Sequence, residues 1–499
     1  MRYLLASHTH HFWGPAIFFT VVLGALLASG PRCALAQTSP PAPTPAVNPD
    51  RLPITTSSPE AAKLFEEALR LSYDMHTEQA LAKLREASRK DPNFTQAWVY
   101  ILWYTSDPVE EKAAVEKALL TSQNATPGEK LLVKWFTSTE GGHFVDAIMA
   151  MNDLLAMYPR DTDLNFDAEI WLDSQREYEA AAKFGKRALE VAPNFAAVLN
   201  SLAYDLAGMH RYDQAIPYLQ RYVELEPGEA NARDSLAEIL QKAGRLDESL
   251  AEYRESLKLD PKKYESQLGL GNDYALLGKQ DRAREEYAKA LPMMSVPQNK
   301  LDCKIQSAIT YAREGNGKQA RLELAAVLAE ATKLQMNDYR ARIHQDLALL
   351  ADSPAVALRE LDEAEAVLQE PGHVSGATRE GLLGRTLRMR ARIAAESGKL
   401  AMARAAVARL QAMVQADPSY SIERSYHGAN GALLAVEKKI AAAIAELQQV
   451  TDEPFSMAKL AELQAAAGNA REAEATRARL KADYGTTFDD WLVVRKFRP

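Results

Sequence analysis

Apolar residues recur three or four positions apart through most of this chain, and they do so in a unit of fixed length. In residues 196–229, for example, the spaced positions hold Leu199, Leu202, Leu206 and Leu219. This spacing places such residues on one face of a helix, so the pattern predicts amphipathic helices, each with one buried face. The pattern breaks once near the middle of the unit and again at its end. We therefore expect two helices in each unit.

Prolines mark the ends of these units. Pro159, Pro193, Pro227 and Pro261 stand 34 residues apart, and Pro92 precedes Pro159 by 67 residues, close to two periods. A proline ends a helix because its ring disfavours the helical conformation in the residue before it. The period therefore predicts a row of repeated helix pairs.

Small residues keep the same phase as the prolines. Twelve residues before the successive prolines stand Ala80, Ala147, Ala181, Ala215 and Ser249. We expect two helix axes to cross closely at these positions, where no large side chain fits. The turn between the two helices holds a glycine, as at Gly244, or a polar residue in its place, as at His210. Glycine suits this position because it adopts the left-handed conformation that closes a helix.

Together these features resemble the tetratricopeptide repeat family. In the clearest repeat they are Leu199, Leu202, Ala203, Leu206, Tyr212, Ala215, Leu219, Tyr222 and Pro227. The next two repeats continue in phase with Leu236, Ala237, Leu240, Gly244, Leu246, Ser249, Tyr253, Pro261, Leu270, Gly271, Tyr274, Gly278, Ala283, Tyr287 and Ala290. The resemblance implies an all-α fold, a right-handed superhelical solenoid of antiparallel helix pairs, with about 11–12 repeats.

The strength of the pattern varies along the chain. We expect a repeat array over residues 59–297, clearest over 128–297, and further degenerate helix pairs over 298–482. Residues 483–499 are predicted to cap the last apolar face, because terminal repeats need covering. The alternative is an exposed docking tail. The apolar residues of this end are Phe488, Trp491, Leu492, Val493, Val494 and Phe497.

The N-terminus predicts export. Residues 16–29 are apolar and uncharged, Arg2 precedes them, and Ala34-Leu35-Ala36 follows. This order is typical of a secretory signal peptide, here residues 1–36, with cleavage before Gln37. The apolar run is shorter than the roughly 20 residues that a membrane-spanning helix needs. We expect a periplasmic or extracellular protein. The alternative is an uncleaved anchor, which would then be the only contact with a membrane.

Composition limits the remaining possibilities. Residues 37–58 contain six prolines and are predicted to be an extended, disordered linker.

The formal net charge is -8, from 59 basic and 67 acidic residues that are spread along the chain. Nucleic-acid binding needs a basic stripe, so we expect no nucleic-acid partner.

The sequence holds no catalytic motif that we can identify. It has no H-E-x-x-H, C-x-x-C or G-x-S-x-G segment, and its histidines lack the spacing of metal ligands on a helix. Cys303 is expected to be a small core residue. We therefore predict no enzyme activity, no cofactor and no metal. The alternative is an accessory or regulatory protein, or an enzyme whose site lies unrecognised in the irregular C-terminal half.

The resemblance implies a concave groove, lined by the first helix of each repeat, that binds a peptide or helix of a partner protein. The groove positions opposite the buried faces are Asn200, Tyr204, Asn231, Asp234, Glu238 and Asn272. Asp234 and Glu238 would repel a carboxylate, so a neutral or basic extended segment is the expected ligand. We expect a non-catalytic scaffold for protein–protein interaction in the periplasm or cell envelope.

Overall fold

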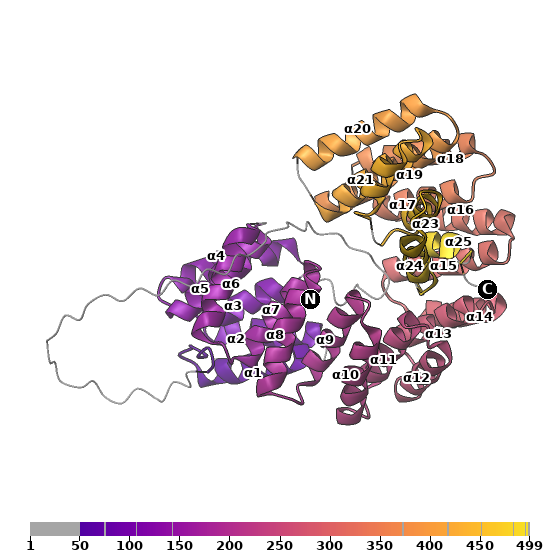
Figure 1. Ribbon diagram of the computed structural model, residues 1–499. Helices are drawn as coiled ribbons and strands as arrows, with labels where there is room; N and C mark the ends of the chain where they lie inside the picture. The colour runs from indigo at the N-terminus through magenta and orange to yellow at the C-terminus, as the bar shows by residue number, and fades with distance from the viewer. Residues whose placement is uncertain are drawn as a thin grey trace, which may run out of the picture. The chain divides into compact units, whose positions relative to one another are not determined.

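The protein is seen here in a computed structural model, and every regular element of its described residues is a helix (Figure 1). The described residues are 50–73, 76–105, 107–141, 143–371, 374–416, 419–450, 452–482, 484–494, 496 and 497. The all-α prediction is confirmed. The predicted signal peptide and residues 37–49 of the predicted linker lie outside the described residues. None of the helices within these ranges is long and apolar enough to cross a membrane.

The chain divides into two compact units, which are described separately. Among the described residues, the N-terminal unit comprises 50–202 and the C-terminal unit comprises 203–497. The first eight helices are α1 (Pro59–Tyr73), α2 (Thr77–Lys90), α3 (Thr95–Tyr104), α4 (Pro108–Ser122), α5 (Pro127–Glu140), α6 (Phe144–Met157), α7 (Thr162–Ser174) and α8 (Tyr178–Val191). Helix α9 (Ala196–Gly208) contains the division between the units.

The C-terminal unit continues the series with one short 3-10 helix. Its elements are α10 (Tyr212–Leu225), α11 (Ala230–Lys242), α12 (Leu246–Leu259), α13 (Tyr264–Leu276), α14 (Gln280–Ala290), η1 (Leu291–Met293), α15 (Pro297–Arg313), α16 (Gly317–Lys333), α17 (Asn337–Leu349), α18 (Pro354–Gln369), α19 (Gly376–Glu396), α20 (Leu400–Ala416), α21 (Tyr420–Val436), α22 (Ile440–Leu447), α23 (Pro454–Ala466), α24 (Ala470–Lys481) and α25 (Phe488–Val494).

Consecutive α-helices form pairs, from α1 with α2 to α23 with α24, and α25 follows the last pair. The described part of the chain thus holds twelve pairs, in agreement with the number of repeats that the sequence predicts. The degenerate region after residue 297 differs mainly in helix length, since α15 and α16 have 17 residues each and α19 has 21.

Left-handed residues close most of the turns inside the pairs, and one of them, Gln335, lies between two pairs. Those with positive φ are Arg176, His210, Gly244, Gly278, Gly315, Gln335, Gly398, Lys438 and Gly468, and the first four stand 34 residues apart. His210 has a φ of 58°, so it occupies the glycine position as the sequence predicts. The next amide then bonds back to the helix, as Arg211 N–H does to the Leu206 carbonyl at 2.8 Å. This bond satisfies a carbonyl at the end of α9.

The predicted prolines end the second helices. Helix α8 ends at Val191, and Ala192 has a φ of -126° before Pro193. In the same way, Glu226 has a φ of -124° before Pro227. Both residues have left the helical region because the proline ring restricts the residue before it.

Aromatic side chains form much of the core of the N-terminal unit. The Trp135 and Trp171 rings meet edge to face with centroids 5.9 Å apart. Tyr73, at the end of α1, contacts Phe166 of α7 at 5.7 Å and Phe195 at 4.8 Å. Helices from the first and fourth pairs are therefore joined through aromatic contacts.

Residues 50–58, the described end of the predicted linker, are bound to the N-terminal unit. The Leu52 side chain is buried, and its N–H donates to Asp161 Oδ2 at 2.7 Å. Gln96 Nε2 donates to the Pro53 carbonyl at 2.6 Å. A proline-rich composition does not reveal that specific partners hold this part of the predicted linker.

Candidate functional site

The six predicted groove residues are mostly inaccessible. Asn200 belongs to the N-terminal unit and the other five to the C-terminal unit. The exposed fractions are 8% for Asn200, 2% for Asp234, 8% for Glu238 and 8% for Asn272, and Tyr204 and Asn231 are half-buried. These residues therefore offer less free surface than the resemblance implies.

Tyr204 and Glu238 contact each other one repeat apart. The Tyr204 hydroxyl donates to Glu238 Oε2 at 2.8 Å, and Lys242 Nζ forms an ion pair with Glu238 at 2.7 Å. Lys242 Nζ also lies 5.6 Å from the centre of the Tyr204 ring. The negative charge of Glu238 is thus compensated inside the protein.

The other predicted groove residues in the C-terminal unit also have internal partners. Lys263 Nζ donates to Asn231 Oδ1 at 3.3 Å, and the Ser266 hydroxyl donates to Asp234. The Tyr287 hydroxyl donates to Asn272 Oδ1 at 2.8 Å. The bonds to Asn231 and Asp234 join successive repeats, and that to Asn272 joins two helices of one pair. A role in partner binding stays a prediction for these residues.

Several buried carboxyl groups have raised pKa values. Burial raises the pKa of Asp167 to about 8, that of Asp273 to about 7 and that of Asp346 to about 6. The three residues lie on α7, α13 and α17, so they belong to different pairs. Perturbed carboxyl groups can mark an active site, but here burial is the main cause and the groups are not gathered together.

The described residues offer no evident nucleophile or metal site. Cys303 is buried, and burial raises the pKa of its thiol to about 12. A thiolate is the reactive form, so this cysteine resembles a core residue, as the sequence predicts. No group of three or more His, Cys, Asp or Glu side chains among the described residues could hold a metal ion.

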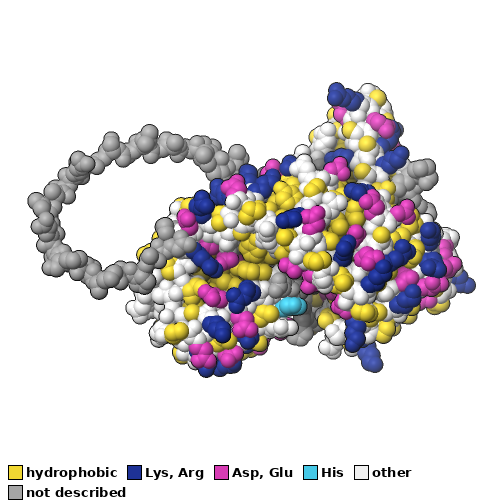
Figure 2. Space-filling view, turned by 90° about the horizontal axis from the view of Figure 1, so that it is seen from below, with side chains coloured by type: hydrophobic (Ala, Val, Ile, Leu, Met, Phe, Trp, Pro, Cys, Tyr) yellow, Lys and Arg dark blue, Asp and Glu magenta, His cyan; other side chains and the backbone are white. Residues whose placement is uncertain are grey.

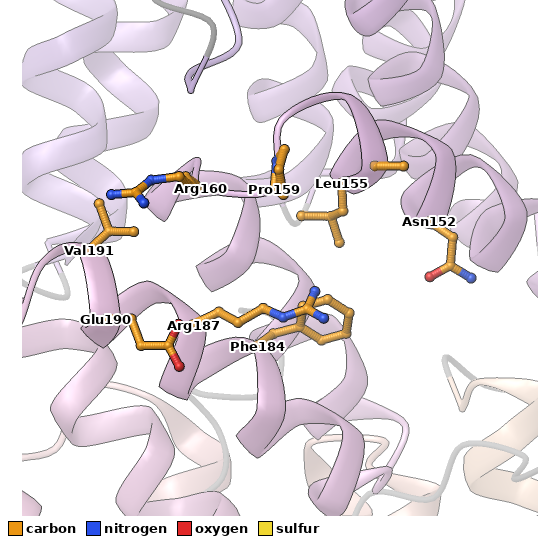
Figure 3. A pocket seen from close by; sticks show the side chains of 9 residues that line it. Asn152, Leu155, Pro159, Arg160, Phe184, Arg187, Glu190 and Val191 are labelled. Atoms are coloured by element: carbon orange, nitrogen blue, oxygen red, sulfur yellow. The ribbon is translucent and has the colours of Figure 1, made fainter.

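An open groove lies between α6 and α8 in the N-terminal unit (Figure 3). It has a volume of about 610 Å³. We call it the α6–α8 groove, and its lining residues are Asn152, Leu155, Ala156, Pro159, Arg160, Phe184, Arg187, Glu190 and Val191. Both helices are the second members of their pairs, so this groove is not the one that the sequence predicts.

Helix α6 exposes apolar residues beside the groove. Its buried face includes Ala147 and Leu154, as the repeat pattern requires. Yet Val145, Ile148 and Met149 are 60%, 43% and 55% exposed. An apolar helix with such an exposed face usually has a partner. The sequence FVDAIMAMNDLLAM carries this signal, which the search for repeat positions passed over.

Exposed apolar side chains are concentrated in this part of the chain. Helix α4 adds Val109 at 79%, Leu119 at 50% and Leu120 at 58%. Figure 2 shows hydrophobic side chains in patches among charged ones on one face of the molecule. Single exposed apolar residues are ordinary, but adjacent ones on a rigid helix form a surface that can bind another protein.

The charges at the α6–α8 groove are mainly positive. Arg187 extends over the Phe184 ring, with its guanidinium carbon 5.4 Å from the ring centre (Figure 3). Arg160 lies at another edge, and its Nε is 3.7 Å from the Asp50 carboxylate. Glu190 supplies one negative charge. The groove thus combines apolar walls with two exposed arginines, in a chain that is acidic overall.

Comparison with known proteins identifies the repeats. The sequence model of the family described as "Tetratricopeptide repeat" matches residues 200–263 and 235–295. The chain therefore contains tetratricopeptide repeats in this segment. Proteins with such repeats generally mediate protein–protein interactions and are typically not enzymes. No curated protein matches the chain.

Solved structures resemble about a third of the chain. YrrB, titled "a TPR protein with an unusual peptide-binding site", is 21% identical and covers 38% of this chain and 97% of its own, with a TM-score of 0.29. TTC0263, a thermophilic TPR protein of Thermus thermophilus, is 23% identical, covering 36% and 96%, with a TM-score of 0.31. MamA from Desulfovibrio magneticus RS-1 is 17% identical, covering 34% and 96%, with a TM-score of 0.31.

Proposed function

We propose that this protein is a non-catalytic scaffold that binds a partner protein, and that the α6–α8 groove is one of its binding surfaces. The observation that carries the proposal is the groove itself, a cleft with a mixed apolar and polar lining and with arginines at its edge, between two helices. An ordered scaffold loses little conformational entropy on binding, so a modest apolar surface can hold a partner segment.

The occupant that best matches this groove is an amphipathic helix. Phe184 and Leu155 provide apolar walls, and Val145 and Met149 extend the apolar surface along α6. An amphipathic helix presents apolar side chains three and four residues apart, which suits a groove that runs between two helices. Its apolar side would cover the exposed residues of α6.

The expected helix carries carboxylates on its flanks. Arg160 and Arg187 both line the groove and are exposed, and Lys183 and Lys186 add positive charge on α8. Arg160 already pairs with a carboxylate, that of Asp50, as it would with a carboxylate of the partner helix. Both side chains of this pair are more than half exposed. An acidic partner would gain from the same attraction.

A photo-crosslinking amino acid at Asn152 tests the proposal in living cells. Asn152 lines the groove, whereas the neighbouring Asp153 is exposed but does not line it and serves as the control. We expect the probe at Asn152 to capture an acidic, amphipathic segment of a partner, identified by mass spectrometry. Capture should fall at least about tenfold with Arg187→Glu and stay unchanged with Lys63→Glu, because Lys63 is exposed on α1 and does not line the groove.

Equal capture from Asn152 and Asp153 would contradict a specific site. Capture that is insensitive to both Phe184→Ala and Arg187→Glu would contradict this groove. The inner surface around Tyr204 and Asn231 is the second candidate, because these two predicted groove residues keep some exposure. Loss of a partner on Asn231→Ala, with no effect of Arg187→Glu, would favour that surface and a neutral or basic ligand.

Export to the periplasm or cell envelope is part of the proposal. Its support is the uncharged apolar run of residues 16–29 followed by Ala34-Leu35-Ala36. Mass spectrometry of the protein purified from its native compartment should find a chain that begins at Gln37. An intact mass that includes residues 1–36, in a membrane fraction, would instead support the anchored alternative.

A further inference from the structure

The C-terminal segment does more than cover the last helix pair. Val493 and Val494 pack with Met457 of α23 and Leu480 of α24, which is the contact expected of a cap. Phe488 instead belongs to a buried apolar cluster with residues of α15, α16 and α17, and α15 stands eight helices before α23. Helices α15, α23, α24 and α25 accordingly lie together in Figure 1.

Phe488 enters an apolar surface that other pairs of the C-terminal unit build. It is 2% exposed, and its ring stacks with the Trp491 ring at 5.9 Å. We call residues 484–494 the tail, and we call this surface, together with Arg385, the tail surface. Its members are Leu301 and Ile305 of α15, Tyr339 and Ile343 of α17, and Arg385 of α19.

An ion pair fixes the register of the segment on this surface. Arg385 Nη2 lies 3.0 Å from Asp489 Oδ1 and 3.5 Å from Asp346 Oδ1, so the tail supplies the closer carboxylate. Arg385 Nη1 also donates to Gln345 Oε1 at 2.9 Å. The tail therefore presents an aromatic ring and a carboxylate side by side, and the surface provides a matching apolar site and a guanidinium.

The segment has the form of a short bound helix. Helix α25 has seven residues, and helices of this length are unstable alone in water. The Thr487 N–H donates to Asp490 Oδ2 at 3.0 Å and the Asp490 N–H donates to the Thr487 hydroxyl at 3.2 Å, a reciprocal cap that starts the helix. Its order therefore depends on the surface that binds it.

The surface does not depend on the tail to the same degree. The other buried members of this cluster all belong to α15, α16 and α17, and Phe488 is the one buried member from the tail. Trp491 and Leu492 are only partly buried. Helix α25 follows the last pair, α23 with α24, and does not stand between two consecutive pairs, so its departure would not separate them.

We propose that residues 484–494 are a displaceable internal ligand, and that the tail surface binds a partner helix of the same chemistry, with an aromatic residue followed by a carboxylate. This inference rests on the proposed function in one respect, namely that the ligand competing with residues 484–494 is a segment of a partner protein. Residues 484–494 would restrict which ligands bind. Because they are tethered, they compete at millimolar effective concentration and exclude weak ligands.

A peptide with the sequence of residues 484–497 tests the proposal. We expect it to bind a chain that ends at Ala482, measured by fluorescence anisotropy, at least about tenfold more tightly than it binds the full-length chain. Binding to the shortened chain should be lost on Arg385→Glu and recovered with a peptide that carries Asp489→Arg. A merely structural role of Arg385 would not give this recovery.

Hydrogen exchange in the full-length chain provides a second measurement, in case the shortened chain does not fold. We expect the amides of residues 488–494 to exchange at least about tenfold faster than those of α15 and α17, through a separate opening. Exchange of α25 only together with α15 and α17 would overturn the proposal, as would a folded shortened chain that does not bind the peptide. The variants Phe184→Ala and Arg187→Glu should leave peptide binding unchanged, so this test is separate from that of the α6–α8 groove.

Discussion

The Tyr100 hydroxyl on α3 donates a hydrogen bond of 2.5 Å to Asp167 Oδ2 on α7, between two pairs of the N-terminal unit. Both side chains are buried, at 4% and 6% exposure. Burial is the main cause of the raised pKa of Asp167, about 8, and the nearby carboxylates of Asp163 and Asp161 raise it further. Asp167 is therefore mostly protonated at neutral pH.

Asp167→Asn should stabilise the N-terminal unit at alkaline pH. The folded pKa of about 8 lies above the usual value of 3.8, so the folded state binds more protons and the stability of the native protein falls as pH rises from about 4 to 8. The variant removes this loss, and we expect a gain of about 1–3 kcal/mol at pH 9. Urea unfolding followed by tryptophan fluorescence measures it. The exposed Asp153→Asn is the control, and equal pH profiles for Asp167→Asn and the native protein would contradict the prediction.

The lowered pKa of Glu453 predicts the opposite pH dependence of stability in the C-terminal unit. It is buried 3.6 Å from Arg388, and despite burial this charge and the Ser456 hydrogen bonds lower the pKa of Glu453 to about 2. Its stabilisation is present above pH 4.5 and is lost as the pH falls towards 2. We expect Glu453→Gln to cost about 3 kcal/mol at pH 7. Acid and urea unfolding measure it.

Glu462→Gln is the control for Glu453→Gln. Its ion pair with Lys459 is exposed, so it should change stability by less than about 0.5 kcal/mol. A similar cost for both variants would show that the burial of Glu453 is not responsible.

Alanine substitutions at two turn glycines distinguish the effect of backbone strain from the effect of the contact with the C-terminal segment. Gly244 and Gly278 share a φ of 77°, so alanine at either site should cost about 1 kcal/mol. A Cβ at Gly278 meets open space, but one at Gly244 would lie 2.3 Å from the Tyr484 ring. Only Gly244→Ala should speed hydrogen exchange in residues 484–494. The added effect should vanish in a Tyr484→Ala background, and its persistence there would point to another cause.

Cys303 should be unreactive in the folded protein. Its side chain is fully buried, and burial raises the pKa of its thiol to about 12. In a chain with Cys33→Ser, we expect modification by an aromatic disulfide reagent at pH 8 to be at least about 100-fold slower than in urea. Modification at the rate of a free thiol would contradict the burial.

The repeat pattern is the part of the fold most open to prediction. The spacing of apolar residues by three or four, the prolines 34 residues apart and the glycine or polar residue at the turn are local properties, and each has the predicted role in the structure. The exposed apolar face of α6 was equally visible in the sequence. The repeat pattern did not identify it, because residue type alone does not distinguish an exposed apolar side chain from a buried one.

The sequence could not predict how exposed the groove residues are or which partners they contact. Periodicity places Asp234 and Glu238 opposite the buried Leu-Ala face, but it does not say how closely the next first helix approaches. The structure places the Tyr204 hydroxyl 2.8 Å from Glu238, across the distance of one repeat. Such a contact depends on the angle between pairs, which arises from all of their packing together.

The sequence by itself determined the helices, their pairing and the turns, because these depend on residues within one 34-residue repeat. The tertiary structure alone decided which faces stay open. Phe488 joins the buried cluster of α15, α16 and α17, and Asp489 pairs with Arg385, in both cases across more than 100 residues of sequence. The α6–α8 groove forms where two second helices leave a gap. These long-range contacts follow from the geometry that successive pairs accumulate, which no single repeat encodes.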